Sequence, residues 1–221
     1  MIHAARGRGQ IVLACASSGI ASLNLPMGAT AHSTFKIPVV NLSKDSTLGI
    51  TAQSGRAELI RQTDLMLFDE ISMIHKHAPE CIDRTLRFLR GNDRPFGGVV
   101  MVCMGDFWQI PPVIPGGNRA KIIRASMLTS QLWAFFKQLE LKINMRVEKA
   151  RRELGEESAQ KVRDWNNFLN RIGNGSERTW GGSDRVQVNN VCVCFYLRVF
   201  IDVCYNMVYT DTRKFIPTEK K

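Results

Sequence analysis

The sequence predicts an α/β fold, with a mostly parallel sheet and helices on both of its faces. Residues 65–68 form an unbroken apolar run, which is typical of a strand buried in a parallel sheet. A second run, residues 99–104, begins with two β-branched valines. Between the two runs, apolar residues recur at helical spacing: Ala78, Ile82, Leu86 and Leu89. We therefore expect an amphipathic helix over residues 76–90 that packs on the sheet.

The other elements follow from the same patterns. Strands are expected where the chain is continuously apolar or alternates apolar with polar residues: 10–16 and 139–143. Helices are expected over four segments: 20–25, 56–62, 130–136 and 158–172. The first of these is stopped by Pro26 and the last by Gly173. Residues 118–124 are expected to form a polar, basic connection.

Asp69 and Glu70 end the first apolar run abruptly. Since charged side chains are rarely buried without a partner, both acids should lie where the strand emerges. Ligands of an open α/β sheet bind at this end of the strands. One acid can hold Mg²⁺ there, and its neighbour can orient or deprotonate an attacking water. A strand followed by an acidic helix start accounts for the same two residues.

The second run ends on Gly105, and Pro111 and Pro112 prevent a helix directly afterwards. Gln109 is therefore presented on a loop beside the strand end, next to the two acids if the strands are neighbours. A glutamine in that place can hydrogen-bond a γ-phosphate or its attacking water.

Composition limits the class of protein. With 221 residues, of which 44% are hydrophobic, the chain can build one sizeable domain. Its net charge of +10 favours a polyanionic partner, nucleic acid first and an anionic membrane second, while a basic surface without a partner is the alternative. Cys15 and Cys103 lie within apolar runs, which indicates reduced, buried thiols in an intracellular protein.

Four segments, taken in order, resemble the motifs of the Pif family of superfamily 1 DNA helicases, nearest to the plant and Helitron type. The four segments are residues 16–21 with 30–38, 69–73, 105–109 and 141–146. The resemblance runs from about residue 10 to about residue 175. It implies a RecA-like P-loop NTPase sheet, present as a partial first motor domain over residues 1–175, followed by a divergent tail over residues 176–221.

The family's activity is implied with the fold: an ATP-dependent DNA helicase of 5′-to-3′ polarity that acts in repair, recombination and telomere maintenance. ATP and Mg²⁺ are the implied substrate and cofactor, single-stranded or forked DNA is the implied partner, and the nucleus is the implied location. By resemblance, Asp69 binds Mg²⁺ and Glu70 activates water, while Gln109 senses the γ-phosphate. Arg146 takes the role of an arginine finger that stabilises the transition state.

The resemblance also implies a set of DNA contacts. Ser18 and Gly19 open a short helix at a turn whose backbone can hold a phosphate, and the family contacts single-stranded DNA there. His32 and Phe35 are expected on a loop near the DNA path, with Phe35 stacked on a base. Each contact has an alternative. The first turn could simply be a capped start of a helix, His32 could cap its own segment, and Phe35 could fill the core.

The sequence departs from the family's pattern in one main respect. It contains no Gly-Lys-Ser or Gly-Lys-Thr, the end of the loop that cradles ATP phosphates, and no motifs of a second motor domain. Trp108 and Pro111 stand where the family commonly has Arg and Leu, which affects the surroundings of Gln109. The inherited role is a helicase, and the alternative is a non-catalytic, basic DNA-binding remnant without ATPase activity.

The last segment, residues 186–209, is rich in Val, Cys, Phe and Tyr and is expected to form one or two strands. A membrane span is disfavoured there because Arg198 and Asp202 would fall within it, each at a cost of about 2.5–3.5 kcal/mol.

Overall fold

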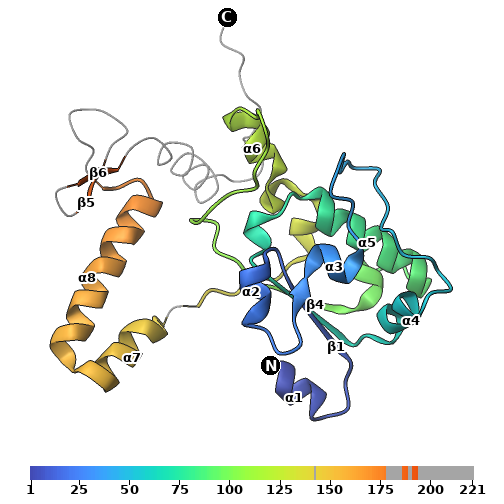
Figure 1. Ribbon diagram of the computed structural model, residues 1–221, viewed down its shortest axis with the longest axis horizontal. Coiled ribbons are helices and arrows are strands. Elements are labelled where there is room, and N and C mark those ends of the chain that lie inside the picture. Colours follow the sequence, from blue (N-terminus) through green and yellow to red (C-terminus); the bar gives the residue numbers. More distant parts are fainter. Residues whose placement is uncertain (142, 178–185, 189–190, 194–221) are drawn as a thin grey trace, which may run out of the picture. The chain divides into compact units, whose positions relative to one another are not determined.

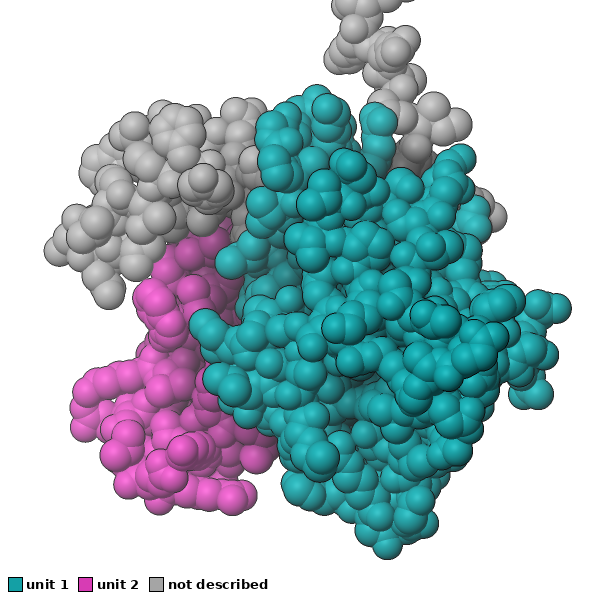
Figure 2. Space-filling model, turned by 45° about the vertical axis from the view of Figure 1, so that its right-hand side comes forward, with its two compact units in different colours: residues 1–136 teal, residues 137–221 magenta. Residues whose placement is uncertain are grey.

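The computed structural model describes residues 1–141, 143–177, 186–188 and 191–193 (Figure 1). The chain divides into two compact units, residues 1–136 and residues 137–221 (Figure 2), and each is considered by itself. The second unit begins at Lys137. The boundary expected after residue 175, between a partial motor domain and a divergent tail, stays a prediction.

A four-stranded sheet forms the centre of the first unit. Its strands are β1 (Val12–Ala16), β2 (Ala29–Thr30), β3 (Leu65–Asp69) and β4 (Val100–Cys103), in the order β2-β1-β3-β4. All three pairings are parallel, so the predicted α/β class and parallel sheet are confirmed. The register aligns Ala16 with Asp69 and Phe68 with Cys103, which brings the carboxyl ends of β1, β3 and β4 to one edge.

The first unit also contains six α-helices and four short 3₁₀ helices in its described residues. The α-helices are α1 (Ile2–Arg6), α2 (Gly19–Leu23), α3 (Ala31–Phe35), α4 (Gly55–Gln62), α5 (His77–Arg90) and α6 (Arg119–Ala125). The 3₁₀ helices are η1 (Ile71–Met73), η2 (Pro95–Gly98), η3 (Met127–Thr129) and η4 (Gln131–Phe135).

Helices cover both faces of the sheet, as predicted. Met66 and Phe68 point into the larger core, which also contains residues of α3, α4 and α5. Leu65 and Leu67 point to the opposite face and pack with the apolar residues of α1. This alternation follows from the two-residue period of a strand and explains why the run of residues 65–68 is apolar throughout.

Helix α5 is the amphipathic helix expected from the sequence. Its four periodic apolar residues are all at most 7% exposed: Ala78, Ile82, Leu86 and Leu89. Gly91 ends it with φ of 57°, a left-handed conformation that glycine adopts without steric cost. Near its end, Arg90 donates to the carbonyls of Ile60, Arg61 and Thr63, which ties α5 to the end of α4.

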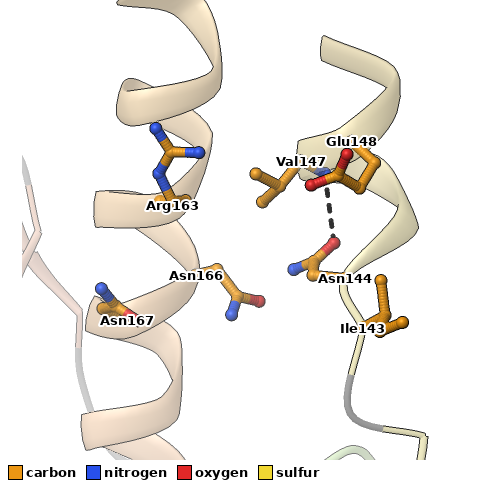
Figure 3. A pocket seen from close by; sticks show the side chains of 7 residues that line it. All are labelled: Ile143, Asn144, Val147, Glu148, Arg163, Asn166 and Asn167. Carbon is orange, nitrogen blue, oxygen red and sulfur yellow. Dashed lines mark hydrogen bonds between the residues drawn. The ribbon is translucent and has the colours of Figure 1, made fainter. Parts of the chain in front are cut away.

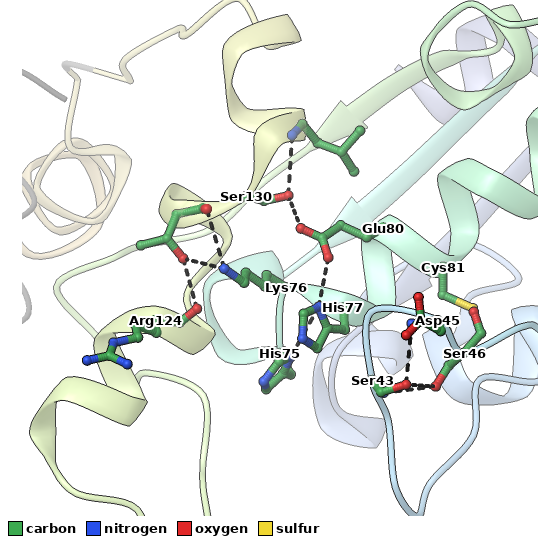
Figure 4. A network of polar contacts seen from close by, with 12 residues as sticks. Ser43, Asp45, Ser46, His75, Lys76, His77, Glu80, Cys81, Arg124 and Ser130 are labelled. Atoms are coloured by element: carbon green, nitrogen blue, oxygen red, sulfur yellow. Dashed lines mark hydrogen bonds and ion pairs between the residues drawn. The ribbon is translucent and has the colours of Figure 1, made fainter. Parts of the chain in front are cut away.

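A polar network joins the start of α5 to η3 and η4 (Figure 4). Glu80 accepts from the hydroxyl of Ser130 at 2.6 Å and contacts Nδ1 of His77 at 2.8 Å. Lys76 reaches the hydroxyl of Thr129 at 3.2 Å. These contacts hold the last segment of the first unit against the helix that packs on the sheet.

Two segments expected to be irregular are short helices instead. In α6, Asn118 accepts a hydrogen bond from the backbone N–H of Lys121 at 3.0 Å, so the expected connection of residues 118–124 begins a capped helix. In α3, Thr30 accepts from the N–H of Ser33, and Lys36 ends the helix in a left-handed conformation. The prediction of a loop around His32 and Phe35 is therefore wrong, because the side chain of Thr30 caps a short helix there.

The strand predicted over residues 139–143 is not formed in the described residues of that segment. Leu139 and Leu141 are 82% and 97% exposed. An alternating pattern gives a strand only where a neighbouring strand supplies hydrogen bonds, and no described strand pairs with this segment.

The second unit contains a helical hairpin, α7 (Met145–Leu154) and α8 (Glu156–Gly173), which turns at Gly155 with φ of 85°. The helix predicted over residues 158–172 is confirmed. Residues 186–193 contribute an antiparallel pair, β5 (Val186–Val188) and β6 (Val191–Val193), in line with the expected strands. The rest of the expected strand segment, residues 194–209, lies outside the described residues. Among the described residues, no helix has the length and apolar character needed to cross a membrane.

Candidate active site

The turns after β1, β3 and β4 are joined by backbone hydrogen bonds beyond the strand ends. The N–H of Ser17 donates to the carbonyl of Asp69 at 3.1 Å. The N–H of Met104 donates to Phe68 at 2.8 Å, and the N–H of Ile71 donates to Met104 at 2.9 Å. The parallel register therefore continues into the turns. The turn after β3, at Glu70, lies between the turn after β1 and the turn after β4.

Glu70 connects β3 to η1 in a left-handed conformation, with φ of 55° and ψ of 40°. Its own N–H donates to Oδ1 of Asp69 at 3.0 Å. Non-glycine residues adopt this conformation uncommonly, and where they do it is often at a functional site. The left-handed residue ends the strand, so Asp69 is the last residue of β3 and Glu70 no longer follows its alternation.

The carboxyl of Glu70 has an unusual electrostatic environment. Burial raises its pKa, and the negative charges of Asp69 and Asp106 raise it further. A carboxylate with a raised pKa is a stronger proton acceptor near neutral pH than an ordinary one. The arrangement therefore suits Glu70 as a general base, the role implied by the resemblance.

Gly105 is required by close packing against η1. A Cβ atom at this position would lie 3.1 Å from the backbone nitrogen of Ser72 and 3.2 Å from its hydroxyl. The glycine thus permits the turn after β4 to contact the turn after β3. The sequence predicts only a tight backbone path here, and the contact with Ser72 supplies the stronger reason for a glycine.

Asp106 is a site residue that sequence reasoning missed. Its Oδ1 accepts from the N–H of Trp108 at 2.9 Å, and its Oδ2 accepts from the side-chain amide of Gln109 at 3.1 Å. Asp106 therefore holds Gln109 on the turn, while its charge acts on Glu70. The sequence contains a signal for this role: an Asp in a turn often accepts hydrogen bonds from the backbone N–H two residues later, and Asp106 stands three residues before Gln109.

The donor set suits a hydrated magnesium ion. Asp69 and Glu70 offer carboxylate oxygens, which Mg²⁺ prefers, and Mg²⁺ commonly takes only one or two protein carboxylates with water and phosphate oxygens as the remainder. Residues 1–141 and 143–177 contain no group of three or more acidic, histidine or cysteine side chains placed to hold a metal alone. The residues present therefore fit a metal shared with a phosphate ligand.

Of the four residues expected to contact DNA, three are at least partly exposed and one is buried. Ser18 caps α2, since its hydroxyl accepts from the N–H of Ala21 at 3.2 Å, while Gly19 is exposed. His32 is half-buried on α3. Phe35 is only 1% exposed and belongs to the core, which leaves no ring face for a base, so the core alternative holds for it.

Arg146 belongs to the second unit, in the first turn of α7. Asn144 caps this helix by accepting from the N–H groups of Arg146 and Val147. The Arg146 side chain is exposed. Its expected role as an arginine finger stays a prediction.

A cavity of about 300 Å³ lies between α7 and α8 (Figure 3). Its lining residues are Ile143, Asn144, Val147, Glu148, Arg163, Asn166 and Asn167. The charged side chains there already have partners: Glu148 accepts from Arg151 at 2.8 Å, and Arg163 pairs with Glu156. This cavity therefore lacks free acid or base groups, and the acids at the sheet edge remain the candidate site.

Replacement of Gly105 by alanine tests the packing of the two turns. Gly105→Ala should lower the free energy of unfolding by roughly 1–3 kcal/mol, because the added methyl would lie 3.1 Å from the Ser72 backbone nitrogen and the two turns would have to move apart slightly. Denaturant unfolding measures the change. Gly55→Ala is the matched control, since nothing lies within 4 Å of a Cβ at that position. Equal effects of the two substitutions would contradict the close contact.

The raised pKa of Glu70 predicts a pH-dependent effect of Glu70→Gln. A carboxyl whose pKa is higher in the folded state favours folding when protonated, and this contribution is lost as pH rises through the folded pKa. At pH 7 the substitution should therefore raise the free energy of unfolding, and the gain should vanish below about pH 4.

Denaturant unfolding at a series of pH values, with a chelator present, measures this difference. Glu140→Gln, on an exposed segment, is the control and should have little effect at any pH. A Glu70→Gln chain less stable than the unchanged chain at pH 7 would contradict the electrostatic assignment.

Known proteins with similar sequences are helicases of one family. The sequence pattern of the PIF1-like helicase family matches residues 1–181. The ATP-dependent DNA helicase Pif1 of Psychrobacter is 34% identical over 173 residues, which is 77% of this chain and 25% of that protein. The ATP-dependent DNA helicase PIF1 of Emericella nidulans is 38% identical over 109 residues, 47% of this chain and 14% of that protein.

The solved structures to which this chain is similar include helicases of the same family. The Bacteroides Pif1 complex with ADP-AlF4 aligns with a TM-score of 0.59 and 27% identity, covering 80% of this chain and 39% of that one. The Bacteroides Pif1 complex with single-stranded DNA aligns with a TM-score of 0.56 and 26% identity, covering 79% and 39%. These neighbours confirm the RecA-like fold expected from the sequence. The chain spans about a quarter of the Psychrobacter relative, and it belongs to the PIF1-like helicase family.

Proposed function

We propose that this chain provides the catalytic acids of the first motor domain of an ATP-dependent DNA helicase. The observation that carries the proposal is the position of Glu70: its carboxyl has a raised pKa beside Asp69 and Asp106, where the turns after three parallel strands meet. Ligands of open α/β sheets bind at this edge. The structural likeness to a Pif1 complex with ADP-AlF4 supports a nucleotide as the ligand.

The proposed roles follow from the chemistry of each side chain. Asp69 holds Mg²⁺ together with phosphate oxygens of ATP, and the metal neutralises negative charge on the phosphates. Glu70 accepts a proton from the attacking water. Gln109, held by Asp106, hydrogen-bonds the γ-phosphate or that water. Arg146 stabilises the negative charge of the transition state.

Single-stranded or forked DNA is the proposed partner. The net charge of +10 favours a polyanion, and a Bacteroides Pif1 to which the chain is similar was crystallised with single-stranded DNA. We place the contacts at Ser18, Gly19 and His32, near the amino end of α2 and on α3. The 5′-to-3′ polarity, the plant and Helitron subtype, telomere maintenance and a nuclear location belong to this proposal as well.

A second candidate function is a basic DNA-binding module without turnover. It is favoured by one specific observation: the 221 residues contain no Gly-Lys-Ser or Gly-Lys-Thr to cradle ATP phosphates. For that reason we expect no ATP hydrolysis by these 221 residues alone.

Hydrolysis is best tested in a hybrid in which residues 10–136 replace the matching segment of Bacteroides Pif1, which supplies the remaining motor. The hybrid should hydrolyse ATP on addition of single-stranded DNA. Glu70→Gln should lower kcat by about 10²–10⁴-fold, because removal of a general base has effects of that size.

Gln109→Ala should also lower kcat in the hybrid, and Gln62→Ala, a surface amide on α4, is its matched control. A hybrid that hydrolyses ATP equally well with Glu70→Gln would reject the catalytic assignment. A hybrid that binds DNA without any turnover would favour the DNA-binding module.

DNA binding is tested with the 221-residue chain itself. Fluorescence anisotropy with a single-stranded oligonucleotide should show an affinity that falls as salt rises, with a slope of about −0.7 per neutralised phosphate. His32→Ala should weaken binding about fivefold, the loss of one hydrogen bond of about 1 kcal/mol. His3→Ala, an exposed histidine on α1, should have no such effect. Equal effects of the two would exclude His32 from the contact.

A further inference from the structure

The turn that carries Gln109 is closed by its own hydrogen bonds. Oδ1 of Asp106 accepts from the N–H of Trp108 at 2.9 Å, and the carbonyl of Asp106 accepts from the N–H of Gln109 at 3.2 Å. Oδ2 of Asp106 accepts from the side-chain amide of Gln109 at 3.1 Å. Because these bonds all lie within residues 106–109, they fix the shape of the turn and leave its place on the protein to other contacts.

Phe107 attaches this turn to the body of the first unit. Asp106 and Gln109 are exposed, whereas Phe107 is half-buried and packs against the larger core. Its ring meets the ring of Trp133 edge to face, with the centroids 5.5 Å apart and an interplanar angle of 85°. Aromatic pairs prefer this geometry, since the positive edge of one ring then meets the negative face of the other.

Trp133 lies on η4 and is itself held from two sides. On one side, η4 follows Ser130, whose hydroxyl donates to Glu80 of α5 at 2.6 Å (Figure 4). On the other side, the centroid of the Trp133 ring lies 6.3 Å from that of Phe136, which in turn lies 5.8 Å from that of Phe96 in η2. The indole is therefore fixed relative to the helix that packs on the sheet.

The position of Phe107 within the turn gives its contact with Trp133 a particular consequence. An aromatic pair in the middle of a core stabilises the whole fold and no single polar group. Phe107, however, directly follows Asp106, which accepts the amide of Gln109, so a movement of its ring displaces both side chains. The contact of Gly105 with η1 fixes the start of the turn, and the aromatic contact fixes the part that carries the amide.

We propose that Trp133 is a positioning residue for Gln109. Its ring holds Phe107, and through Phe107 it holds the hydrogen-bonded turn after β4 in place at the carboxyl edge of the sheet. We call this pair of rings, Phe107 and Trp133, the aromatic brace. The effect of Trp133 on hydrolysis rests on the proposed function of Gln109, whereas the brace itself does not.

Hydrogen exchange in the 221-residue chain, followed by NMR, tests the brace. The backbone N–H groups of Trp108 and Gln109 are hydrogen-bonded within the turn, so their exchange reports how often the turn opens. Trp133→Ala should speed exchange at both by about tenfold, because the edge-to-face contact and the area it buries are lost. Trp133→Phe retains a ring and should change this exchange by less than about twofold. Trp133→Leu, which is apolar but has no ring, is the second variant if Trp133→Ala does not fold.

A role confined to overall stability would give a different pattern. Amides at the centre of the sheet, such as that of Leu67, exchange through larger openings, whereas an exposed turn opens without them. A general loss of stability would therefore speed exchange at Leu67 and leave Trp108 and Gln109 unchanged. Faster exchange at the turn is the result expected of the brace, whatever the change in β3.

A double-mutant cycle asks whether Trp133 acts through Phe107. In a Phe107→Ala chain, Trp133→Ala should speed exchange at Gln109 by less than about twofold, because residues that share a contact are not additive. Trp165→Ala is the matched control, since its ring lies 5.4 Å from that of Phe168 within α8. It removes a Trp–Phe pair of similar separation and should leave exchange at Gln109 unchanged.

Two results would overturn the proposal: unchanged exchange at Trp108 and Gln109 in the Trp133→Ala chain, or equal acceleration with and without Phe107. The measurement needs neither ATP nor DNA, so its outcome is separate from that of the hybrid assay. In an active hybrid, Trp133→Ala should lower kcat by about tenfold and have no further effect beside Gln109→Ala. Faster exchange in the chain, together with a hybrid that hydrolyses no ATP, would retain the brace and reject the proposed function.

Discussion

The parallel register of β1, β3 and β4 is the constraint on which the candidate site depends. It aligns Ala16 with Asp69 and Phe68 with Cys103, so three strands end at one edge within a residue of one another. Backbone hydrogen bonds then carry the alignment into the turns that follow. A shift of β3 by one residue would move each of its side chains to the other face of the sheet, and would displace Asp69 and Glu70 with them, because side chains alternate along a strand. Asp64 and Asp69, which flank the apolar run, oppose such a shift because it would move a charged side chain further into the sheet.

The same edge collects features that are unfavourable for stability. Glu70 has a left-handed backbone, and its carboxyl is partly desolvated beside two other acids. Its Oε2 and the hydroxyls of Ser17 and Ser72 are buried without a hydrogen-bond partner among the described residues. Such features persist only where the surrounding structure holds them in place. Here the surroundings are the core beneath the sheet, with α5 packed on Met66 and Phe68, and the close contact of Gly105 with η1. Unfavourable local terms of this kind concentrate where binding or chemistry occurs.

The two compact units contribute different parts of the proposed motor. The first holds the acids, Gln109 and the proposed DNA contacts around α2 and α3. The second holds Arg146, whose helix begins at the cap formed by Asn144.

The sequence by itself determined the parallel α/β class, the amphipathic helix over residues 76–90 and the family, because these depend on local periodicity and on short motifs. It also located Asp69 and Glu70 at the end of one strand and Gln109 on the loop after the next strand. Only the tertiary structure decided that Phe35 is core, that Asp106 holds Gln109, and that Gly105 contacts Ser72. It also rejected the strand expected over residues 139–143. Each of these depends on a neighbour distant in the chain or on a single capping side chain, and a pattern read along one strand or helix contains neither.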